Sequence, residues 1–124
     1  MIAGIGTDIV AVARLDSFYQ RHGQRALEKL CRPGAYRVCW RQGSGRFQAK
    51  RFAANEAFGK ALGIGLVAPA TLPSIGINHD ALGRPLFEYA TALAAHLAQR
   101  RLIAHLSISD ERDYAIAFVI LEQS

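Results

Sequence analysis

Apolar and polar residues alternate loosely at the start of the chain, over residues 2–13. The apolar positions are mostly Ile and Val, so this segment is predicted to be a β-strand. Two glycines lie in it, Gly4 and Gly6, and a strand glycine allows another part of the backbone to come close. The pattern therefore predicts a strand that packs tightly against another element.

Shorter helical patterns follow the strand. A first helix is expected from about Asp16, a candidate N-cap, through Arg21. Residues 24–31 have the pattern of one or two more helical turns, and residues 35–42 that of a short helix after a proline-glycine pair. This part of the chain is expected to be helical in short pieces.

The longest helical pattern covers residues 46–62. Four apolar residues recur in it at helical spacing and would face the core: Phe47, Ala54, Phe58 and Ala61. Gly63 and Gly65 follow and are suited to end the helix.

Two hairpins and a helix are predicted in the second half of the chain. Residues 74–80 and 85–90 flank a turn that contains glycine and proline, and residues 103–109 and 114–122 form a second pair of β-rich segments. Residues 90–100 between the pairs are rich in helix formers. Strands grouped in hairpins predict a mostly antiparallel sheet packed against the long helix. The expected fold class is α+β, in a single domain that spans residues 1–124.

The chain is basic, with a net charge of +5 from 15 Lys and Arg against 10 Asp and Glu. Much of the excess lies between Arg14 and Arg51, where only Asp16 and Glu28 are acidic. Such a surface attracts an anionic partner: a nucleic acid, a phosphorylated cofactor or an acidic protein. Few aromatic residues there are spaced for base stacking, so single-stranded nucleic acid is disfavoured.

No segment of the sequence is typical of a membrane or secreted protein. The apolar stretches are shorter than the roughly 20 residues of a membrane helix, and the N-terminus lacks the basic start of a signal peptide. We therefore expect a soluble cytoplasmic protein. Cys31 and Cys39 are too few for a disulfide framework or a zinc site and are expected to be free thiols.

Two carboxylates are candidates for chemistry, and each has an ordinary alternative. Asp8 lies inside an apolar strand, where an unpaired charge is unfavourable by roughly several kcal/mol. It either faces solvent or a basic partner, or it binds a hard cation such as Mg²⁺, which prefers oxygen ligands. Glu56 is the obvious second ligand, but Glu56 and Lys60 also have the i, i+4 spacing of an exposed helical ion pair.

Basic residues near these carboxylates are also open to two interpretations. Arg51 and Lys50 lie toward the start of the long helix, where positive charge opposes the helix dipole unless an anion is bound. His105 lies on a predicted strand, and a single strand histidine is more often packed or half-exposed than catalytic.

Several stretches match one family in order and spacing. These are GIGTDIVAVARL at residues 4–15, KRFAANEAFGKALGIG at 50–65 and HLSISDERDYAIAFVI at 105–120, with NHDALGRP at 78–85 between the last two. Together they resemble the holo-acyl-carrier-protein synthases, the small bacterial class of 4′-phosphopantetheinyl transferases. The resemblance covers nearly the whole chain.

The resemblance implies transfer of 4′-phosphopantetheine from coenzyme A to a serine of apo-acyl carrier protein, with release of 3′,5′-ADP. It implies that Asp8 and Glu56 hold Mg²⁺ and that Lys60 contacts the phosphates. Either Glu56 or a metal-bound water would take the proton from the serine. Arg51 and His105 would bind the nucleotide end, with the Gly83, Arg84 and Pro85 segment near the adenine.

The family further implies two kinds of protein partner. Acidic carrier proteins would dock on the first helix, at Arg14, Arg21 and Arg25. The chain would assemble as a homotrimer with active sites between subunits. The resemblance leaves open whether the carrier protein serves fatty acid or polyketide synthesis.

One departure from the family's motif stands beside the proposed metal ligand. The helix motif usually reads Lys-Glu-Ala, and this chain has Asn55 in place of the lysine. The alternative hypothesis is therefore a non-catalytic homologue that binds coenzyme A or a carrier protein. A small basic nucleic-acid-binding domain is a third hypothesis, supported by charge alone.

Overall fold

The computed structural model describes residues 1–23, 25, 45–65, 70 and 74–124. Its elements, in chain order, are β1 (Ile2–Ala11), α1 (Val12–His22), α4 (Gly45–Leu62), β2 (Ile75–His79), β3 (Pro85–Tyr89), α5 (Thr91–Gln99), β4 (Leu102–Asp110) and β5 (Tyr114–Gln123). The helices expected over 24–31 and 35–42 lie outside the described residues, apart from the helical Arg25, and so do both cysteines.

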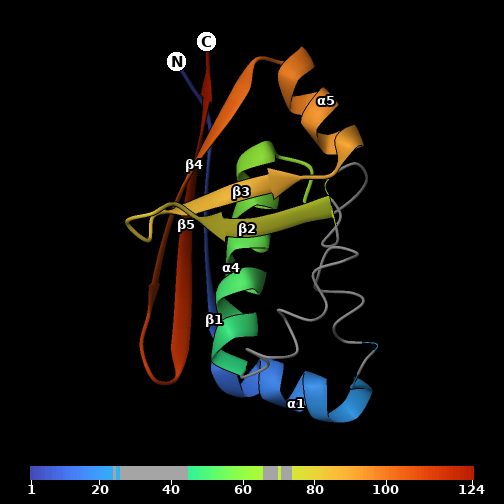
Figure 1. The fold of residues 1–124 in the computed structure, drawn as a ribbon, viewed down its shortest axis with the longest axis vertical. Helices are drawn as coiled ribbons and strands as arrows, with labels where there is room; N and C mark the ends of the chain where they lie inside the picture. The colour runs from blue at the N-terminus through green and yellow to red at the C-terminus, as the bar shows by residue number, and fades with distance from the viewer. Residues whose placement is uncertain (24, 26–44, 66–69, 71–73) are drawn as a thin grey trace.

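The strands form two antiparallel sheets. β1, β5 and β4 make a three-stranded sheet in the order β1-β5-β4, and β2 pairs with β3 in a separate hairpin. The long helix α4 lies along one side of the larger sheet, and the β2–β3 hairpin crosses in front of this helix in Figure 1. Antiparallel strands with a helix layer confirm the predicted α+β class.

The core lies between α4 and the larger sheet. Alternate residues of β5 are buried there, namely Ala115, Ala117, Val119 and Leu121. A Cβ atom on Gly4 would overlap the backbone oxygen of Ala61, and one on Gly6 would overlap that of Ala57. The two glycines therefore allow β1 to lie directly against the backbone of α4, as the sequence predicted.

Helix α4 has the predicted core face. Ala54, Phe58 and Ala61 are buried, and Phe47 packs partly buried against the same core. Phe58 contacts the rings of Phe87 and Tyr89 on β3, with centroid distances of 5.2 and 5.7 Å. These aromatic contacts attach the small hairpin to α4.

Helix α1 begins earlier than the sequence suggested. It starts at Val12, directly after β1, where the Val12 amide donates a hydrogen bond to the Asp113 carbonyl oxygen at 2.8 Å. Asp16 is therefore not the N-cap of this helix. Its Oδ1 instead accepts a hydrogen bond from the amide of Gly45, the first residue of α4, at 2.8 Å. The N-cap prediction was wrong because this acceptor serves the start of another helix.

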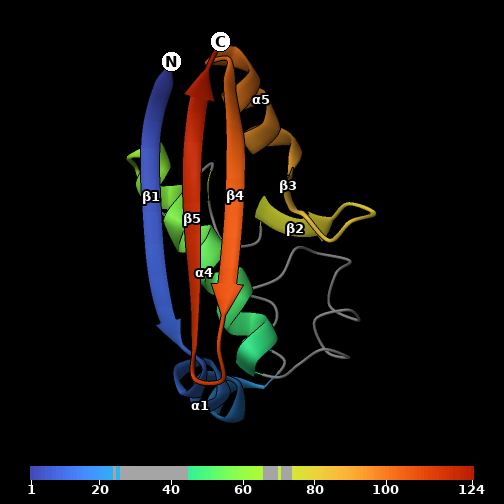
Figure 2. The ribbon, with the colours of Figure 1, turned by 90° about the vertical axis from the view of Figure 1, so that its left-hand side faces the viewer.

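No described helix covers the other side of the larger sheet. Figure 2 shows the three strands in front, with α4 behind them. The outward positions carry large apolar side chains, 42–63% exposed: Ile5, Ile9, Ile103, Ile116 and Phe118. We call these five residues the open face. In the described parts of the chain, no helix is long and apolar enough to cross a membrane.

Candidate active site

Asp8 lies on the side of β1 that faces α4, two residues after Gly6. Its Oδ1 is 3.0 Å from Lys60 Nζ, and the same nitrogen donates a hydrogen bond to the Thr7 carbonyl oxygen at 3.0 Å. The Asp8 side chain is 17% exposed, whereas that of Lys60 is 54% exposed. Lys60 thus forms an ion pair with the strand carboxylate rather than the simple exposed pair with Glu56 that its helical spacing suggested.

Glu56 lies one helical turn before Lys60 and is partly buried. Burial raises the pKa of its carboxyl group most, and the negative charge of Asp8 raises it further. The charges of Lys60 and Arg14 oppose this rise. Lys60 is bonded to Asp8 and follows Glu56 by one helical turn, so β1 and α4 bring the two carboxylates to the same lysine.

A pocket of about 210 Å³ lies between α4, the small hairpin and the end of β4. Its lining includes Lys50 and Arg51 from α4, Gly83 and Pro85 from the hairpin turn, and Asp110 from β4. Arg51 is only 7% exposed, and its guanidinium carbon lies 5.7 Å from the Phe47 ring centroid. This pocket can accept an anion, because its basic groups outnumber its acidic one.

Lys50 and Arg51 do not lie at the start of the long helix, so the prediction that their charges oppose its dipole was wrong. α4 begins at Gly45, so Lys50 and Arg51 lie beyond its first turn, where the dipole has little effect. Arg46, in the first turn, is paired with Asp110 at 2.8 Å. Lys50 and Arg51 make the pocket positive because they line it, and the helix dipole has no part in this.

The turn of the small hairpin is held by Asp80. Its Oδ1 accepts hydrogen bonds from the amides of Leu82 and Arg84, both at 2.9 Å. These bonds to the charged form, led by the one from Arg84, lower the pKa of Asp80. Gly83 has φ = 87°, a conformation that favours glycine. The Asp80 carboxylate therefore fixes the conformation of the turn that leads into Pro85.

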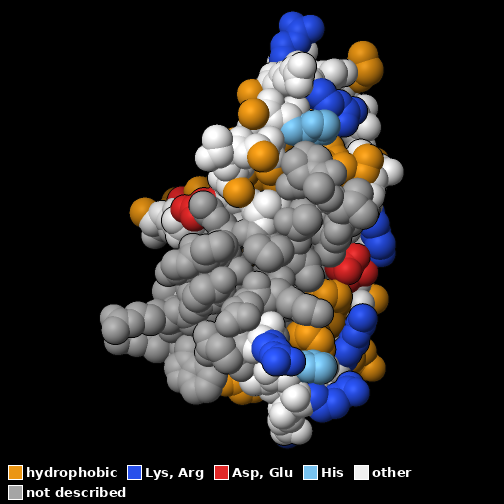
Figure 3. Space-filling view, turned by 90° about the vertical axis from the view of Figure 1, so that its right-hand side faces the viewer, with side chains coloured by type: hydrophobic (Ala, Val, Ile, Leu, Met, Phe, Trp, Pro, Cys, Tyr) orange, Lys and Arg blue, Asp and Glu red, His pale blue; other side chains and the backbone are white. Residues whose placement is uncertain are grey.

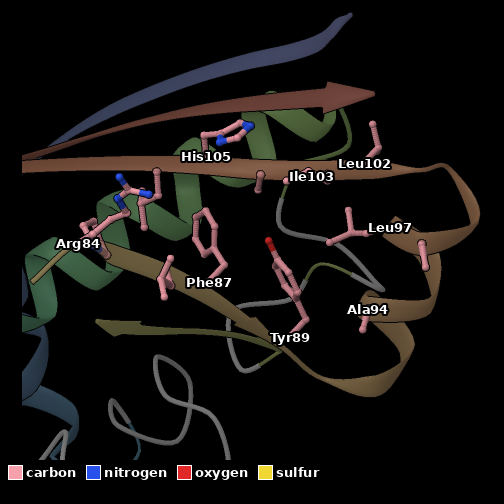
Figure 4. Close-up of a pocket in the computed structure, with 13 residues that line it drawn as sticks. Arg84, Phe87, Tyr89, Ala94, Leu97, Leu102, Ile103 and His105 are labelled. Atoms are coloured by element: carbon pink, nitrogen blue, oxygen red, sulfur yellow. The ribbon is translucent and has the colours of Figure 1, made fainter. Parts of the chain in front are cut away.

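A larger pocket of about 770 Å³ lies between β3, α5 and β4 (Figure 4). Arg84, Pro85 and His105 belong to its lining, together with apolar residues that include Phe87 and Tyr89. Burial raises the pKa of the Tyr89 hydroxyl, so it stays protonated. Pro85 lines both pockets, but Arg51 and His105 line different ones.

His105 belongs to the outward row of β4. Residues at even positions of this strand turn toward the core, and His105 is exposed at an odd position. Its Nε2 lies 3.1 Å from Glu122 Oε1 on β5. Within one chain, His105 therefore lies on the same side of the sheet as the open face and apart from Arg51.

The predicted docking residues Arg14, Arg21 and Arg25 are all exposed. Arg14 and Arg21 lie on α1, and the guanidinium carbon of Arg14 is 5.2 Å from the ring centroid of Phe52 on α4. Figure 3 shows Lys and Arg side chains gathered at the lower end of the molecule, where α1 lies. This end of the molecule presents positive charge next to the carboxylate pair.

Comparison with known proteins gives a consistent result. Residues 4–119 match the 4′-phosphopantetheinyl transferase superfamily. The chain is 56% identical to a holo-[acyl-carrier-protein] synthase of Dechloromonas aromatica, with both chains covered completely, and 52% identical to one of Azoarcus sp., with 98% of each chain covered. The crystal structure of the synthase from Neisseria meningitidis superposes with a TM-score of 0.92 at 40% identity, over 99% of this chain and 100% of that one. A Bacillus anthracis synthase in complex with CoA (3′,5′-ADP) superposes with a TM-score of 0.82 at 31% identity, over 100% and 99%.

The chain belongs to the holo-[acyl-carrier-protein] synthase family. It is therefore an enzyme, a phosphopantetheinyl transferase. This confirms the family that the sequence motifs suggested. It also favours catalysis over a role as a non-catalytic homologue or a nucleic-acid-binding domain.

The oxygen ligands that Asp8 and Glu56 offer are of the kind that a magnesium ion prefers. Asp8 and Glu56 supply carboxylate oxygens, and their mutual repulsion would be relieved by a cation between them. Among the described residues, no group of three or more His, Cys, Asp and Glu side chains could hold a metal. A pair of carboxylates is nonetheless the usual protein share of a magnesium site, since Mg²⁺ takes one or two carboxylates together with water and substrate phosphates.

Asn55 does not lie at the open carboxylate site. It is 1% exposed, on the buried side of α4, and neither of its amide atoms has a hydrogen-bond partner among the described residues. The departure from the family's lysine therefore changes the interior next to α4.

Three polar groups near the site had no role in the sequence-based hypothesis. His79 and Asp110 line the smaller pocket, and the Thr7 carbonyl oxygen binds Lys60. Sequence spacing gave no signal for His79, because the charged side chains in the same pocket come from α4 and β4. The NHD segment around it was part of the family resemblance, which is the one signal that pointed to it.

Proposed function

We propose that this enzyme transfers 4′-phosphopantetheine from coenzyme A to a serine of apo-acyl carrier protein, in a Mg²⁺-dependent reaction that gives holo-acyl carrier protein and 3′,5′-ADP. The observation that carries the proposal is the pairing of Asp8 on β1 with Lys60 on α4, next to Glu56. Related synthases crystallised with coenzyme A or its nucleotide support the choice of donor. Because coenzyme A is a cytoplasmic donor, we assign the reaction to the cytoplasm.

Each group of the carboxylate site has a chemical task in this proposal. A magnesium ion held by Asp8 and Glu56 would neutralise the pyrophosphate and draw charge from the breaking bond. Lys60 Nζ is already held at the site by two acceptors, so it is positioned to bind a phosphate oxygen and to stabilise the leaving 3′,5′-ADP. Glu56, one helical turn before Lys60, would take the proton from the attacking serine hydroxyl, directly or through a water molecule.

The nucleotide end of coenzyme A would occupy the smaller pocket. Arg51 and Lys50 would face its phosphate groups, and the Gly83 to Pro85 segment would lie against the base. His105 lines a different pocket and belongs to the outward row of β4. It would reach the nucleotide of a neighbouring copy more readily than that of its own chain.

The open face supports a homotrimer. Contiguous exposed apolar surface is typical of a protein–protein interface, and the five side chains of the open face are contributed by all three strands of the sheet. Packing of this face against further copies would bury them. It would also bring His105 of one copy toward the nucleotide pocket of the next, so that each active site would be completed by two chains.

Mass spectrometry tests the proposed reaction directly. Purified protein is mixed with coenzyme A, Mg²⁺ and an apo-acyl carrier protein, and the carrier should gain the mass of one phosphopantetheine. Glu56→Gln and removal of Mg²⁺ by a chelator should each abolish the gain. Unchanged turnover of Glu56→Gln would contradict the assignment of the site, and no gain with the unmodified protein would contradict the reaction.

A further inference from the structure

A cation–π contact connects helix α1 with the helix that carries Glu56. The guanidinium carbon of Arg14 lies 5.2 Å from the ring centroid of Phe52. Phe52 precedes Glu56 by four residues, so their side chains lie on the same side of α4. The charge of Arg14 also acts on the Glu56 carboxyl group. The Phe52 ring therefore lies under an arginine at the border between α1 and the carboxylate pair.

The backbone beneath Arg14 is fixed on several sides. The Val12 amide is bonded to Asp113 in the β4–β5 turn, and Leu15 is buried. Asp16 binds the amide of Gly45 at the start of α4. Because the backbone is held in this way, the direction of the Arg14 guanidinium depends on its side-chain rotamers, and contact with a flat ring restricts them.

A second arginine–phenylalanine contact of the same kind lies on α4 itself. Arg51 stacks over Phe47 at 5.7 Å, and both residues line the pocket assigned to the nucleotide. The two contacts thus hold arginines at two different parts of the site. Arg14 is exposed on the docking helix, whereas Arg51 is buried at the pocket.

We propose that Phe52 is a positioning residue for recognition of the carrier protein. Its ring holds the Arg14 guanidinium over α4, beside Glu56, where the arginine binds an acidic group of the docked carrier close to the serine that reacts. The inference rests on the proposed function, since it assumes a carrier-protein substrate. It assigns to Phe52 an effect on carrier binding and none on coenzyme A binding.

Equilibrium binding and steady-state kinetics with an apo-acyl carrier protein test the proposal. Phe52→Leu keeps an apolar side chain but removes the ring, and we expect about a two- to fivefold increase in the Kd and KM for the carrier, the range that corresponds to an exposed cation–π contact. The KM for coenzyme A should not change. Phe52→Trp keeps an aromatic face and should retain carrier binding. Phe47→Leu is the matched comparison and should leave the Kd for the carrier unchanged.

A double-mutant cycle separates positioning from a general structural effect. In an Arg14→Ala background, Phe52→Leu should cause no further increase in the Kd for the carrier, because the ring acts through that arginine. An equal increase with and without Arg14, or an equal increase in the KM for coenzyme A, would overturn the proposal. A different result would contradict the proposed function alone: the protein would bind the carrier protein but would not transfer phosphopantetheine to it. If the unmodified protein does not bind carrier at all, both proposals are wrong.

Discussion

The Lys60 ammonium group is bound to Asp8 Oδ1 at 3.0 Å, although the two residues are 52 positions apart in the chain. This contact connects the first strand with the long helix. Among the described residues of β1 and α4, it is the one salt bridge that joins the two elements. Because the Lys60 side chain is 54% exposed, the ion pair itself contributes little stability, and its value lies in the position it gives to the ammonium group.

Replacement of Lys60 should therefore reduce catalysis far more than stability. Lys60→Met keeps the length of the side chain and removes its charge, and we expect kcat for phosphopantetheine transfer to fall by about 10²–10³-fold, the usual effect of removing one group that stabilises developing negative charge. The free energy of unfolding should change by less than about 1 kcal/mol. Arg112→Met, in the exposed β4–β5 turn, removes the same net charge and serves as the control. Equal losses of kcat in both variants would show that only net charge matters.

The pKa of Glu56 predicts a pH-dependent stability. Its folded-state pKa is raised by burial and by Asp8, so the ionised carboxylate is less stable in the folded protein than in the unfolded one. The associated destabilisation is absent at pH values below the ordinary pKa of a glutamate and is complete once pH has risen through the raised value. Glu56→Gln should therefore increase the free energy of unfolding of the metal-free protein at neutral pH, by about 0.5 kcal/mol or less after allowance for solvent screening.

Urea denaturation with a chelator present, at neutral pH and at about pH 4, measures this difference. The stabilisation by Glu56→Gln should shrink toward the lower pH. Added Mg²⁺ should stabilise the unmodified protein and have less effect on the variant, since binding to the folded state alone raises its stability. A stabilisation that is the same at both pH values would rule out the ionised carboxylate as its cause.

The local patterns were sufficient to predict most of the fold. Alternation predicted β1, β4 and β5, and the apolar spacing of α4 predicted its core face, because burial on one side of an element imposes its period on the sequence. Asp16 was misassigned as an N-cap, since its partner Gly45 lies 29 residues away and only tertiary packing brings the two together.

The candidate site was predicted less completely, for the same physical reason. Helical spacing offered Glu56 as the partner of Lys60, whereas the structure bonds Lys60 to Asp8. That choice depends on how closely β1 approaches α4, which local sequence cannot specify. Arg51 lies on α4, on one side of the larger sheet, and His105 points to the other side. Neither of the two motifs that suggested these residues could show this separation.

The buried position of Asn55 predicts that restoring the family's lysine has little benefit. Asn55 is 1% exposed, so Asn55→Lys places a charged group in the interior beside α4 and should lower the free energy of unfolding by roughly 1–3 kcal/mol. Asn55→Met has a side chain of similar length without the charge and should be less destabilising. Urea denaturation compares the two variants. We expect no increase in kcat for Asn55→Lys, and a large increase would instead favour the hypothesis that Asn55 impairs catalysis.

The open face predicts that assembly and activity depend on each other. Phe118→Asp introduces a charge at the centre of an apolar surface and should convert the proposed homotrimer to monomers, measured by analytical ultracentrifugation. Transfer activity should fall with it, because His105 would no longer reach a neighbouring nucleotide pocket. Thr91→Asp, at the exposed start of α5 and away from that face, is the control. A fully active monomeric variant would contradict the shared site.

Gly6 offers a final test, because it allows the close approach on which the carboxylate pair depends. A Cβ atom on this residue would overlap the Ala57 carbonyl oxygen, which belongs to a helix backbone and cannot rotate away. Gly6→Ala must therefore displace β1 from α4, and we expect a loss of stability of about 1–3 kcal/mol or more. Asp8 is two residues further along the strand, so its carboxylate should move away from Lys60, and the affinity for Mg²⁺ should fall. Calorimetric titration with Mg²⁺, under conditions where the variant is shown to be folded, measures that affinity. Unchanged Mg²⁺ affinity in a folded Gly6→Ala protein would mean that the approach of strand and helix does not set the geometry of the site.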